Sequence, residues 1–342
     1  MKRSHCTTAL ALALTTLAAG ALTGCSNGKP SGTQTNSGQT TKSGAITIAY
    51  LQKQGDQQYF VDEANGAKKE AATLGNVKID VVDLGTDSNK AISAVSTEVG
   101  QKVDGMIIVV PDQKIGPQVI DAASAANTPL VASDDPIQSG SGTPAAFVGF
   151  DSVQMGTSVG TKAGTLFKNA GWTAANTKVM AAYQQGLSDC QQREQGEEQG
   201  FKTAAGVSLP IVKLGTDNSV VDAQNKAGAA LTANPDVKHW VVWGCNDESE
   251  TGVVTALQNS RIASANIIGV GLGAYLTCKD WKAGVSSGNK AALYIGGADV
   301  GSAAVKVLVG HIRNGSPLPP TTIAQTHMVD ASSWNSVMGS CT

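Results

Sequence analysis

Short runs of β-branched and apolar residues alternate with alanine-rich stretches of helical period from residue 45 onward, and this alternation constrains the fold most. In the first half, strands are predicted at Ile46–Leu51, Val77–Val82, Met106–Val110, Leu130–Ser133 and Phe147–Phe150. Helices are predicted near Tyr59–Leu74, Asn89–Gln101 and Gly116–Ala126. Near-continuous apolar strands separated by helices are typical of a parallel sheet covered on both faces.

The same pattern then restarts. Strands are predicted near Val179–Tyr183, Ile211–Leu214, Trp240–Trp243 and Ile267–Val270, with helices near Gln192–Ala205, Val220–Ala233, Glu248–Gln258 and Tyr275–Ala283. A late strand near Leu293–Ile295 and a helix across Val300–Arg313 follow. A folded part of about 300 residues exceeds what one hydrophobic core usually supports. We therefore expect an α/β protein with two doubly wound parallel-sheet lobes.

The chain begins as an exported lipoprotein would. Lys2 and Arg3 precede an apolar run over Ala9–Leu22, which is too short for a permanent membrane span and is typical of an export signal. Small residues directly before Cys25 fit a lipobox, so residues 1–24 are predicted to be removed and Cys25 lipidated. An ordinary signal with a coincidental cysteine is the alternative. Residues 25–44 are polar and are predicted to form a flexible tether to the cell membrane.

Composition argues against several functions. The net charge of −2 and the 15% of charged residues predict no nucleic-acid partner, and no second long apolar segment predicts a transmembrane helix. No CxxC spacing or histidine constellation indicates a metal or a nucleophilic site, so we expect no metal, no cofactor and no catalytic residue. The glycines of 269–273 have the wrong spacing for a dinucleotide fingerprint and indicate a strand-to-helix turn.

Polar residues follow predicted strands in both halves of the chain. Lys53, Asp112, the pair Asp134-Asp135, and Asn246 all stand just after such strands. Ligands of doubly wound sheets bind at the carboxyl ends of the strands, so one site between two lobes is expected. Adjacent aspartates point opposite ways at a strand end, which favours hydroxyl binding over a catalytic acid pair, with a structural turn as the alternative.

The chain resembles the type I periplasmic solute-binding proteins of ABC transporters, and among them the L-arabinose-binding proteins. The most specific stretch runs through Asn234-Pro235-Asp236-Val237-Lys238-His239-Trp240, Gly244-Cys245-Asn246-Asp247 and Ile267-Ile268-Gly269-Val270-Gly271. The resemblance implies three segments that cross between the lobes, near Phe150–Ser152, Tyr294–Gly296 and Gln325–Met328. The implied lobes are 45–150 with 296–326, and 151–295 with 327–342.

The resemblance also implies a ligand set. Its members are Lys53, Gln57, Tyr59, Phe60, Asp134, Asp135, Phe150, Arg193 and Asn246. Gln57 stands where the family has an acidic residue, Tyr59 where it has a tryptophan, and Gly273 where it has a second asparagine. Capping could account for Asn246 and core packing for Phe60 or Phe150. Solvated surface cations remain the alternative for Lys53 and Arg193.

Four cysteines lie in the folded part: Cys190, Cys245, Cys278 and Cys341. An exported chain with an even number favours disulfides, and three pairings are possible. If the resemblance holds, Cys190 and Cys245 lie at the cleft edge of one lobe. That placement favours Cys190–Cys245 and Cys278–Cys341.

From the resemblance we expect an extracytoplasmic, lipid-anchored monomer that captures a small neutral sugar or sugar alcohol of the pentose, pentitol or tetritol class. Its partner would be the permease of an ABC importer. A ligand sensor that feeds a signalling receptor is the alternative, and a secreted glycoside hydrolase is less favoured because no suitable acid pair is visible.

Overall fold

The computed structural model describes residues 42–341, so the expected signal at 1–24, the lipidation site Cys25 and most of the expected tether lie outside the described residues. The last expected tether residues already belong to the fold. The backbone N–H of Lys42 donates to the carbonyl of Ile312 at 3.0 Å, and its ammonium lies 2.6 Å from Asp104. The folded part thus begins by Lys42, earlier than the expected residue 45.

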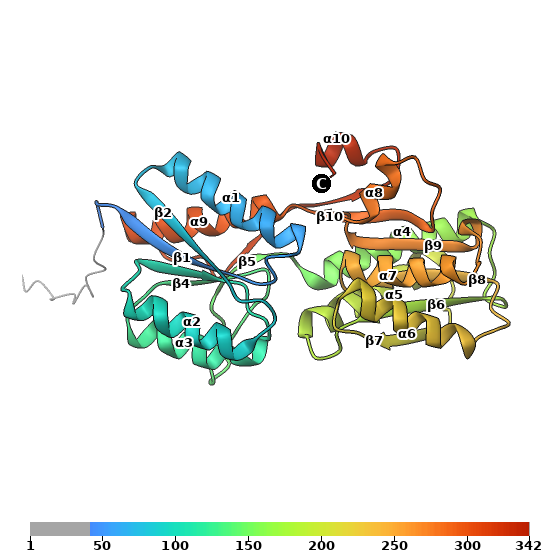
Figure 1. Cartoon of the computed structure of the whole chain (residues 1–342), viewed down its shortest axis with the longest axis horizontal. Helices are drawn as coiled ribbons and strands as arrows, with labels where there is room; N and C mark the ends of the chain where they lie inside the picture. The colour runs from blue at the N-terminus through green and yellow to red at the C-terminus, as the bar shows by residue number, and fades with distance from the viewer. Residues whose placement is uncertain (1–41, 342) are drawn as a thin grey trace, which may run out of the picture. The chain divides into compact units, whose positions relative to one another are not determined.

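The first lobe is a six-stranded parallel sheet in the order β11-β5-β4-β3-β1-β2. Its strands are β1 (Ile46–Gln52), β2 (Val77–Asp83), β3 (Gly105–Ile108), β4 (Leu130–Ser133), β5 (Ala146–Gly149) and β11 (Thr321–Ile323). Helices α1 (Gln58–Leu74) and α9 (Gly297–Asn314) cover one face, and α2 (Ser88–Gly100) and α3 (Gly116–Ala125) cover the other, with a short 3-10 helix η1 (Gln113–Ile115) before α3 (Figure 1).

The central strand β1 shows why both faces need cover. Ile48 and Tyr50 pack into the core under α1 and α9, whereas Ala49 and Leu51 pack into the core under α2 and α3. Successive strand residues point to opposite faces, so a strand covered on both sides is apolar throughout.

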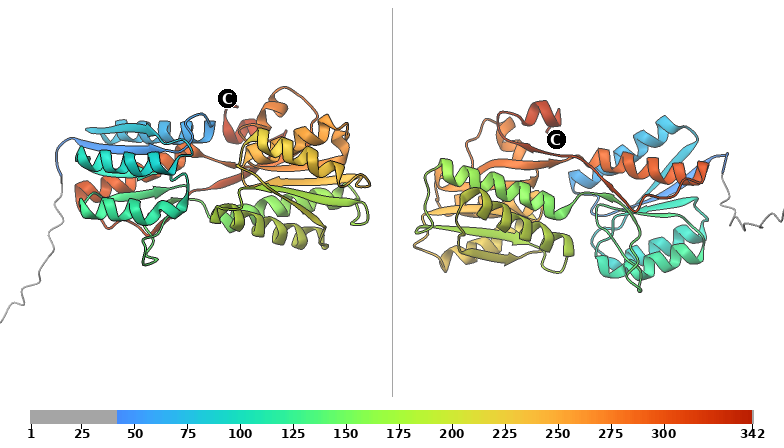
Figure 2. Two further views of the ribbon diagram at one scale, coloured as in Figure 1. Left: turned by 60° about the horizontal axis from the view of Figure 1, so that its bottom comes forward. Right: turned by 180° about the vertical axis from the view of Figure 1, so that it is seen from behind.

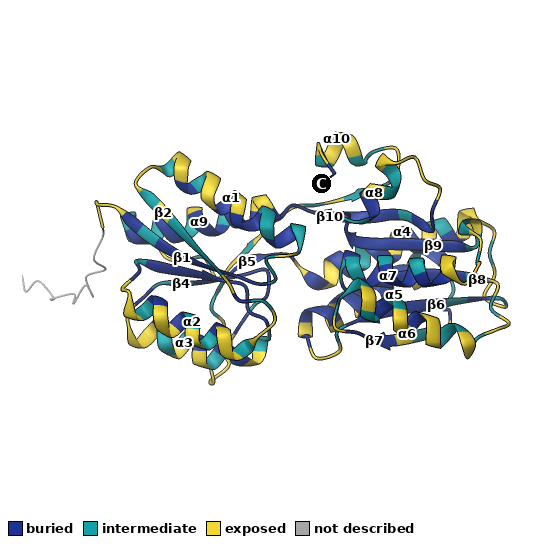
Figure 3. Cartoon of the chain, viewed as in Figure 1, coloured by how far each residue is buried: buried dark blue, intermediate teal, exposed yellow. Residues whose placement is uncertain are grey.

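The second lobe repeats this plan with the sheet order β12-β10-β9-β8-β6-β7. Its strands are β6 (Thr177–Tyr183), β7 (Ile211–Gly215), β8 (His239–Gly244), β9 (Ile267–Gly273), β10 (Asn289–Ile295) and β12 (Thr326–Val329), of which β12 is antiparallel to β10. Its helices are α4 (Ser152–Asn169), α5 (Ser188–Ala205), α6 (Val220–Thr232), α7 (Asp247–Asn259), α8 (Thr277–Lys282) and α10 (Trp334–Met338), with a 3-10 helix η2 (Ser264–Asn266) before β9. Buried strands and half-exposed helices recur in both lobes (Figure 3). The predicted α/β fold with two parallel-sheet lobes is confirmed.

Three segments connect the two sheets (Figure 2). The chain passes from β5 to α4, returns from β10 to α9, and passes again from β11 to β12. Thr326 pairs with Ile295 in the second sheet. The last stretch of chain in the second lobe therefore begins at residue 326, one residue before the expected boundary at 327. Each lobe is therefore built from separate stretches of chain.

Helix α4 was not predicted. One of its faces packs Met155 and Phe167 into the core, but the side that meets α5 carries glycines, which have low helix propensity. A Cβ atom on Gly156 would lie 1.9 Å from the carbonyl oxygen of Arg193, and one on Gly200 would lie 2.4 Å from that of Thr157. The two helices thus pack backbone against backbone, which only glycine permits. This packing fixes α5, the helix that carries Arg193.

The disulfides join Cys190 to Cys245 and Cys278 to Cys341, the pairing favoured above. The first joins the start of α5 to the loop after β8, and the second ties the end of the described chain to α8. Within residues 42–341 no helix combines the length and hydropathy needed to cross a bilayer.

Candidate binding site

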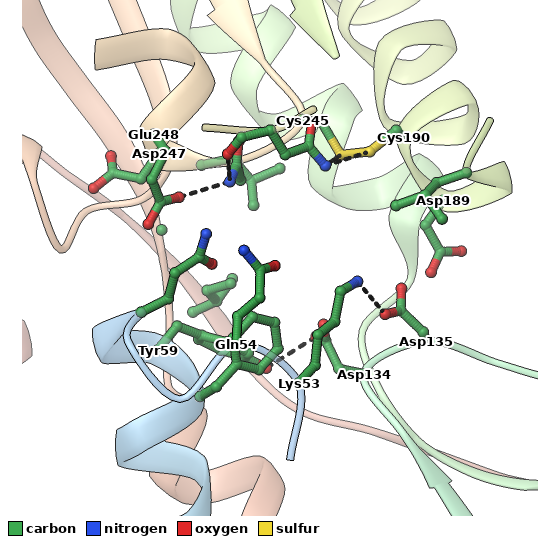
Figure 4. Close-up of a pocket in the computed structure, with 18 of the residues that line it drawn as sticks. Lys53, Gln54, Tyr59, Asp134, Asp135, Asp189, Cys190, Cys245, Asp247 and Glu248 are labelled. Atoms are coloured by element: carbon green, nitrogen blue, oxygen red, sulfur yellow. Dashed lines mark hydrogen bonds and ion pairs between the residues drawn. A yellow bond between two sulfur atoms is a disulfide. The ribbon is translucent and has the colours of Figure 1, made fainter. Parts of the chain in front are cut away.

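A pocket lies between the lobes at the carboxyl ends of their strands (Figure 4). In both sheets the strand order reverses beside the first strand, which is where doubly wound sheets bind ligands. The pocket has a volume of about 70 Å³, measured as the space open to the centre of a water molecule. One water needs ~10–15 Å³ on this measure, so the space suits several waters or one small solute.

Eight of the nine expected ligand residues line this pocket. They are Lys53, Gln57, Tyr59, Phe60, Asp134, Asp135, Arg193 and Asn246. The ninth, Phe150, is not among the lining residues; it is 5% exposed and lies in the hydrophobic core. The expectation that Phe150 walls the pocket is wrong for this structure. The alternation of side chains along β5 could not predict whether Phe150 faces the pocket or the core, because Phe150 lies just beyond the last strand residue, Gly149.

Lys53 and Asp135 form a buried ion pair on the first lobe. The ammonium donates to Asp135 Oδ2 at 2.9 Å, and both side chains are nearly inaccessible to solvent. Burial by itself lowers the pKa of Lys53, but the attraction of Asp135 outweighs it and the pKa is raised. The ammonium also lies 5.9 Å from the centroid of the Phe60 ring. Lys53 is thus a fixed cation rather than a solvated one.

Asp134 has a backbone that few residues tolerate. Its φ of +59° is left-handed, a conformation that aspartate adopts more readily than bulky residues. Its Oδ1 accepts from the hydroxyl of Tyr59 at 2.9 Å. Burial, followed by repulsion from Asp135, raises the pKa of Asp134, while Arg193 and Lys53 oppose the rise. A strained, buried carboxylate at a strand end is typical of a functional position.

The buried carboxyl group of Glu63 contacts the end of β4, on the residue just before the paired aspartates. Ser133 Oγ donates to Glu63 of α1, and Glu63 is fully buried. Burial is the largest cause that raises the pKa of Glu63 to about 8, with repulsion from Asp134 next. Glu63 lies outside the pocket lining, and it holds the residue that precedes the paired aspartates.

Arg193 is presented by α5 on the second lobe and is only 8% exposed. Its Nη1 donates to the carbonyl oxygen of Cys245 at 2.9 Å, and its Nε is buried without a partner in the described structure. The disulfide Cys190–Cys245 links the same two segments as the hydrogen bond from Arg193, namely the start of α5 and the loop after β8. Arg193 therefore retains donor capacity for a guest in the pocket.

Asn246 has a mainly structural set of contacts. Its Oδ1 caps α7 by accepting from the N–H of Ser249 at 3.1 Å. Its Nδ2 donates to the carbonyl of Asn218 at 3.0 Å and to Glu248 at 2.7 Å. Both amide hydrogens of Asn246 are therefore used within the protein. Asn246 both caps α7 and lines the pocket.

Three carboxyl groups that line the pocket were not among the expected ligand residues: those of Asp189, Asp247 and Glu248. Asp189 lies in the first turn of α5, where an acidic residue is ordinarily explained by the helix dipole. Glu248, in the first turn of α7, has the same explanation. Burial raises the pKa of Glu248 to about 7, with repulsion from Asp247 next. Only the meeting of the lobes distinguishes them from ordinary first-turn acids.

Tyr275, also missed, lies on the second lobe just beyond β9 and meets Tyr59 of the first lobe. Their ring centroids are 6.1 Å apart in an edge-to-face arrangement. The hydroxyl of Tyr275 donates to the carbonyl of Ile295 at 3.1 Å, next to the second crossing segment. The pair forms an apolar side to an otherwise polar pocket, which suits a guest with both C–H and O–H groups.

Within residues 42–341 there is no group of three histidine, cysteine or acidic side chains placed to hold a metal ion. The pocket instead assembles fixed charges, amides and aromatic rings. Such groups bind a polar solute by hydrogen bonds and stacking.

Comparisons with known proteins agree with this geometry. The model of a periplasmic binding protein domain matches residues 48–316. An ABC transporter L-arabinose-binding periplasmic protein of Azospirillum brasilense is 27% identical over 300 residues, which are 85% of this chain and 88% of that protein.

Solved structures share the fold. A solute-binding protein from Burkholderia graminis in complex with D-arabinose superposes with a TM-score of 0.74 at 19% identity, covering 87% of this chain and 99% of that one. A solute-binding protein from Mycobacterium smegmatis with bound glycerol gives 0.73 at 23% identity, covering 87% and 99%.

Proposed function

The chain belongs to the periplasmic binding protein domain family, and from this premise we propose that it captures a small sugar or sugar alcohol for an ABC importer. The solute would be of the pentose, pentitol or tetritol class and would be held by closure of the two lobes. The relatives named above are solute-binding proteins of ABC transporters, which supports a binding role and an extracytoplasmic location.

One observation carries the proposal: fixed hydrogen-bonding groups of opposite character face one pocket from both lobes. The first lobe supplies the acceptors Asp134 and Asp135 and the donor Lys53. The second lobe supplies Arg193, whose buried Nε has no partner in the described residues. Hydroxyl groups donate and accept at once, so a polyol can satisfy both sets. Ligand binding shifts the lobes toward closure because only the closed state offers both sets of contacts.

Two positions argue that arabinose is not the best ligand. Gln57 removes a charged acceptor that the resemblance implies. At Gly273, whose φ is +136°, a Cβ atom would lie 2.9 Å from that of Asp247, so an asparagine would not fit without strain. A ligand that needs both partners would lose about 1–3 kcal/mol for each unpaired group. We therefore favour another pentose or an acyclic polyol.

Isothermal titration of the mature protein with pentoses, pentitols and tetritols tests the proposal. We expect saturable 1:1 heat with at least one member and weaker binding of L-arabinose. Heat with none of them would overturn the proposed solute class. Hydrolysis of glycosides is not proposed, because the relatives named above are solute-binding proteins.

The lipid anchor at Cys25, the permease partner and the monomeric state complete the proposal. Globomycin treatment of producing cells should leave an uncleaved, slower-migrating precursor if signal peptidase II processes the chain. Normal processing under that treatment would remove the anchor from the account.

A further inference from the structure

Asp189 faces Asp135 across the pocket, one from each lobe (Figure 4). Asp189 lies in the first turn of α5 in the second lobe, whereas Asp135 follows β4 of the first. Both are lining residues, and Asp189 is only 3% exposed. Closure of the lobes therefore brings together two acidic side chains that are nearly inaccessible to solvent.

The two carboxyl groups differ in what satisfies them. Asp135 Oδ2 accepts from Lys53 at 2.9 Å. Asp189 Oδ2 is buried and has no hydrogen-bond partner among residues 42–341. A buried acceptor without a partner is destabilising, and more so when it is charged. This oxygen is an acceptor that a donor group on a solute can satisfy.

The charges of the lining residues also favour a cationic group in the pocket. Five lining side chains carry carboxyl groups and two carry cations, so acidic groups exceed basic ones by three. Asp247 is satisfied internally by the Thr277 hydroxyl at 2.7 Å, and Glu248 accepts from Asn246 at 2.7 Å. Asp189 interacts with Arg193 and with Asp135, but its buried Oδ2 accepts no hydrogen bond from residues 42–341.

We propose that the preferred solute is an amino-substituted sugar or polyol whose ammonium group lies between Asp189 and Asp135. An ammonium offers three donors and one positive charge, so it can satisfy the free oxygen of Asp189 and share Asp135 with Lys53. A hydroxyl offers a single donor and no charge. This inference rests on the proposed function and changes the expected solute from a neutral to a cationic one.

The protonation of Asp189 agrees with this assignment. Burial is the largest cause that raises the pKa of Asp189 to about 8, and repulsion from Asp135 is the next, against attraction from Arg193. In the empty pocket at neutral pH the carboxyl group is thus mostly neutral. An ammonium placed beside it favours the charged form and compensates the excess of acidic groups.

Matched pairs of ligands test the inference by titration calorimetry of the mature protein. Each pair is a parent polyol or sugar and its amino-deoxy analogue, such as ribitol with 1-amino-1-deoxyribitol, or ribose with 2-amino-2-deoxyribose. We expect one amine to bind at least 10-fold more tightly than its parent. Asp189→Asn, which keeps the shape and removes the charge, should bring that ratio close to one. Glu194→Gln removes a buried carboxyl group that lies on the same helix outside the pocket lining and pairs with Lys213, so it should preserve the ratio.

The outcomes separate the two proposals. If parents bind and no amine binds more tightly than its parent, the amino substituent is wrong while the proposed function stands. If no member of any pair binds, both fail. A ratio that persists in Asp189→Asn would place the ammonium elsewhere and overturn the assignment. The wild-type ratio is decisive by itself should a variant fold poorly.

Discussion

The side chain of Gln113, in the first lobe, accepts hydrogen bonds from both the backbone N–H and the hydroxyl of Ser188, in the second. The distances are 3.1 and 2.6 Å. The amide nitrogen of Gln113 meanwhile donates to the carbonyl of Pro136 in its own lobe at 2.9 Å. Gln113 thus holds α5 against the first lobe, one residue before Asp189.

Gln113→Ala should therefore favour the open state and weaken binding. Two lost hydrogen bonds of about 1 kcal/mol each predict 5- to 30-fold weaker affinity at unchanged stoichiometry. Calorimetry measures the affinity, and small-angle scattering of the ligand-free protein should show a larger radius of gyration. Gln118→Ala, at an exposed position of α3 in the same lobe, serves as the control. Equal affinity of the two variants would mean that Gln113 does not stabilise closure.

Asp134→Asn should weaken binding by at least 100-fold while changing the melting temperature of the ligand-free protein little. The charge that strengthens hydrogen bonds to ligand hydroxyls is lost, but a side chain compatible with φ of +59° is retained. Tyr59→Phe removes only the hydroxyl that holds Asp134 and should cost less, roughly 3- to 10-fold. A larger loss in Tyr59→Phe than in Asp134→Asn would reverse their assigned roles.

Glu63 predicts a pH dependence of stability. Burial, with repulsion from Asp134, raises the pKa of Glu63 to about 8. A carboxyl group with this raised folded pKa contributes stability that is present below its unfolded pKa of about 4.3 and is lost as pH rises through about 8. Glu63→Gln mimics the protonated form and removes this dependence. The melting temperature of the variant relative to wild type should therefore rise between pH 5 and pH 9; a constant difference would contradict a raised pKa.

The disulfide Cys190–Cys245 should support binding as well as stability. It joins the segment that carries Asp189 and Arg193 to the loop whose carbonyl accepts from Arg193. Replacing both cysteines by serine should cost about 2–4 kcal/mol of stability and also weaken affinity several-fold. The same change at Cys278–Cys341, whose cysteines do not line the pocket, should lower stability only. If both double replacements weaken affinity equally, Cys190–Cys245 has no special part in positioning Asp189 and Arg193.

Hydrophobic patterning predicted β1 to β10 and most helices, because the central strands are buried on both faces. The short edge strands β11 and β12, which are partly exposed, were missed. Helix α4 was missed although Met155, Val159 and Phe167 recur at helical spacing and pack into the core. Glycines, which have low helix propensity, occupy the side that packs on α5. Strand ends located Lys53 and the paired aspartates. Asp189 could not be found in this way, because its neighbour Asp135 comes from the other lobe and only the tertiary structure brings them together.

The central claim is that both lobes build one binding site. Calorimetric titration of the tightest ligand into wild type, Asp134→Asn and Arg193→Gln tests it most directly, with circular dichroism to check folding. We predict 1:1 heat for the wild type and at least 100-fold weaker binding in each folded variant. Unchanged affinity in either one would assign the site to a single lobe and contradict the account.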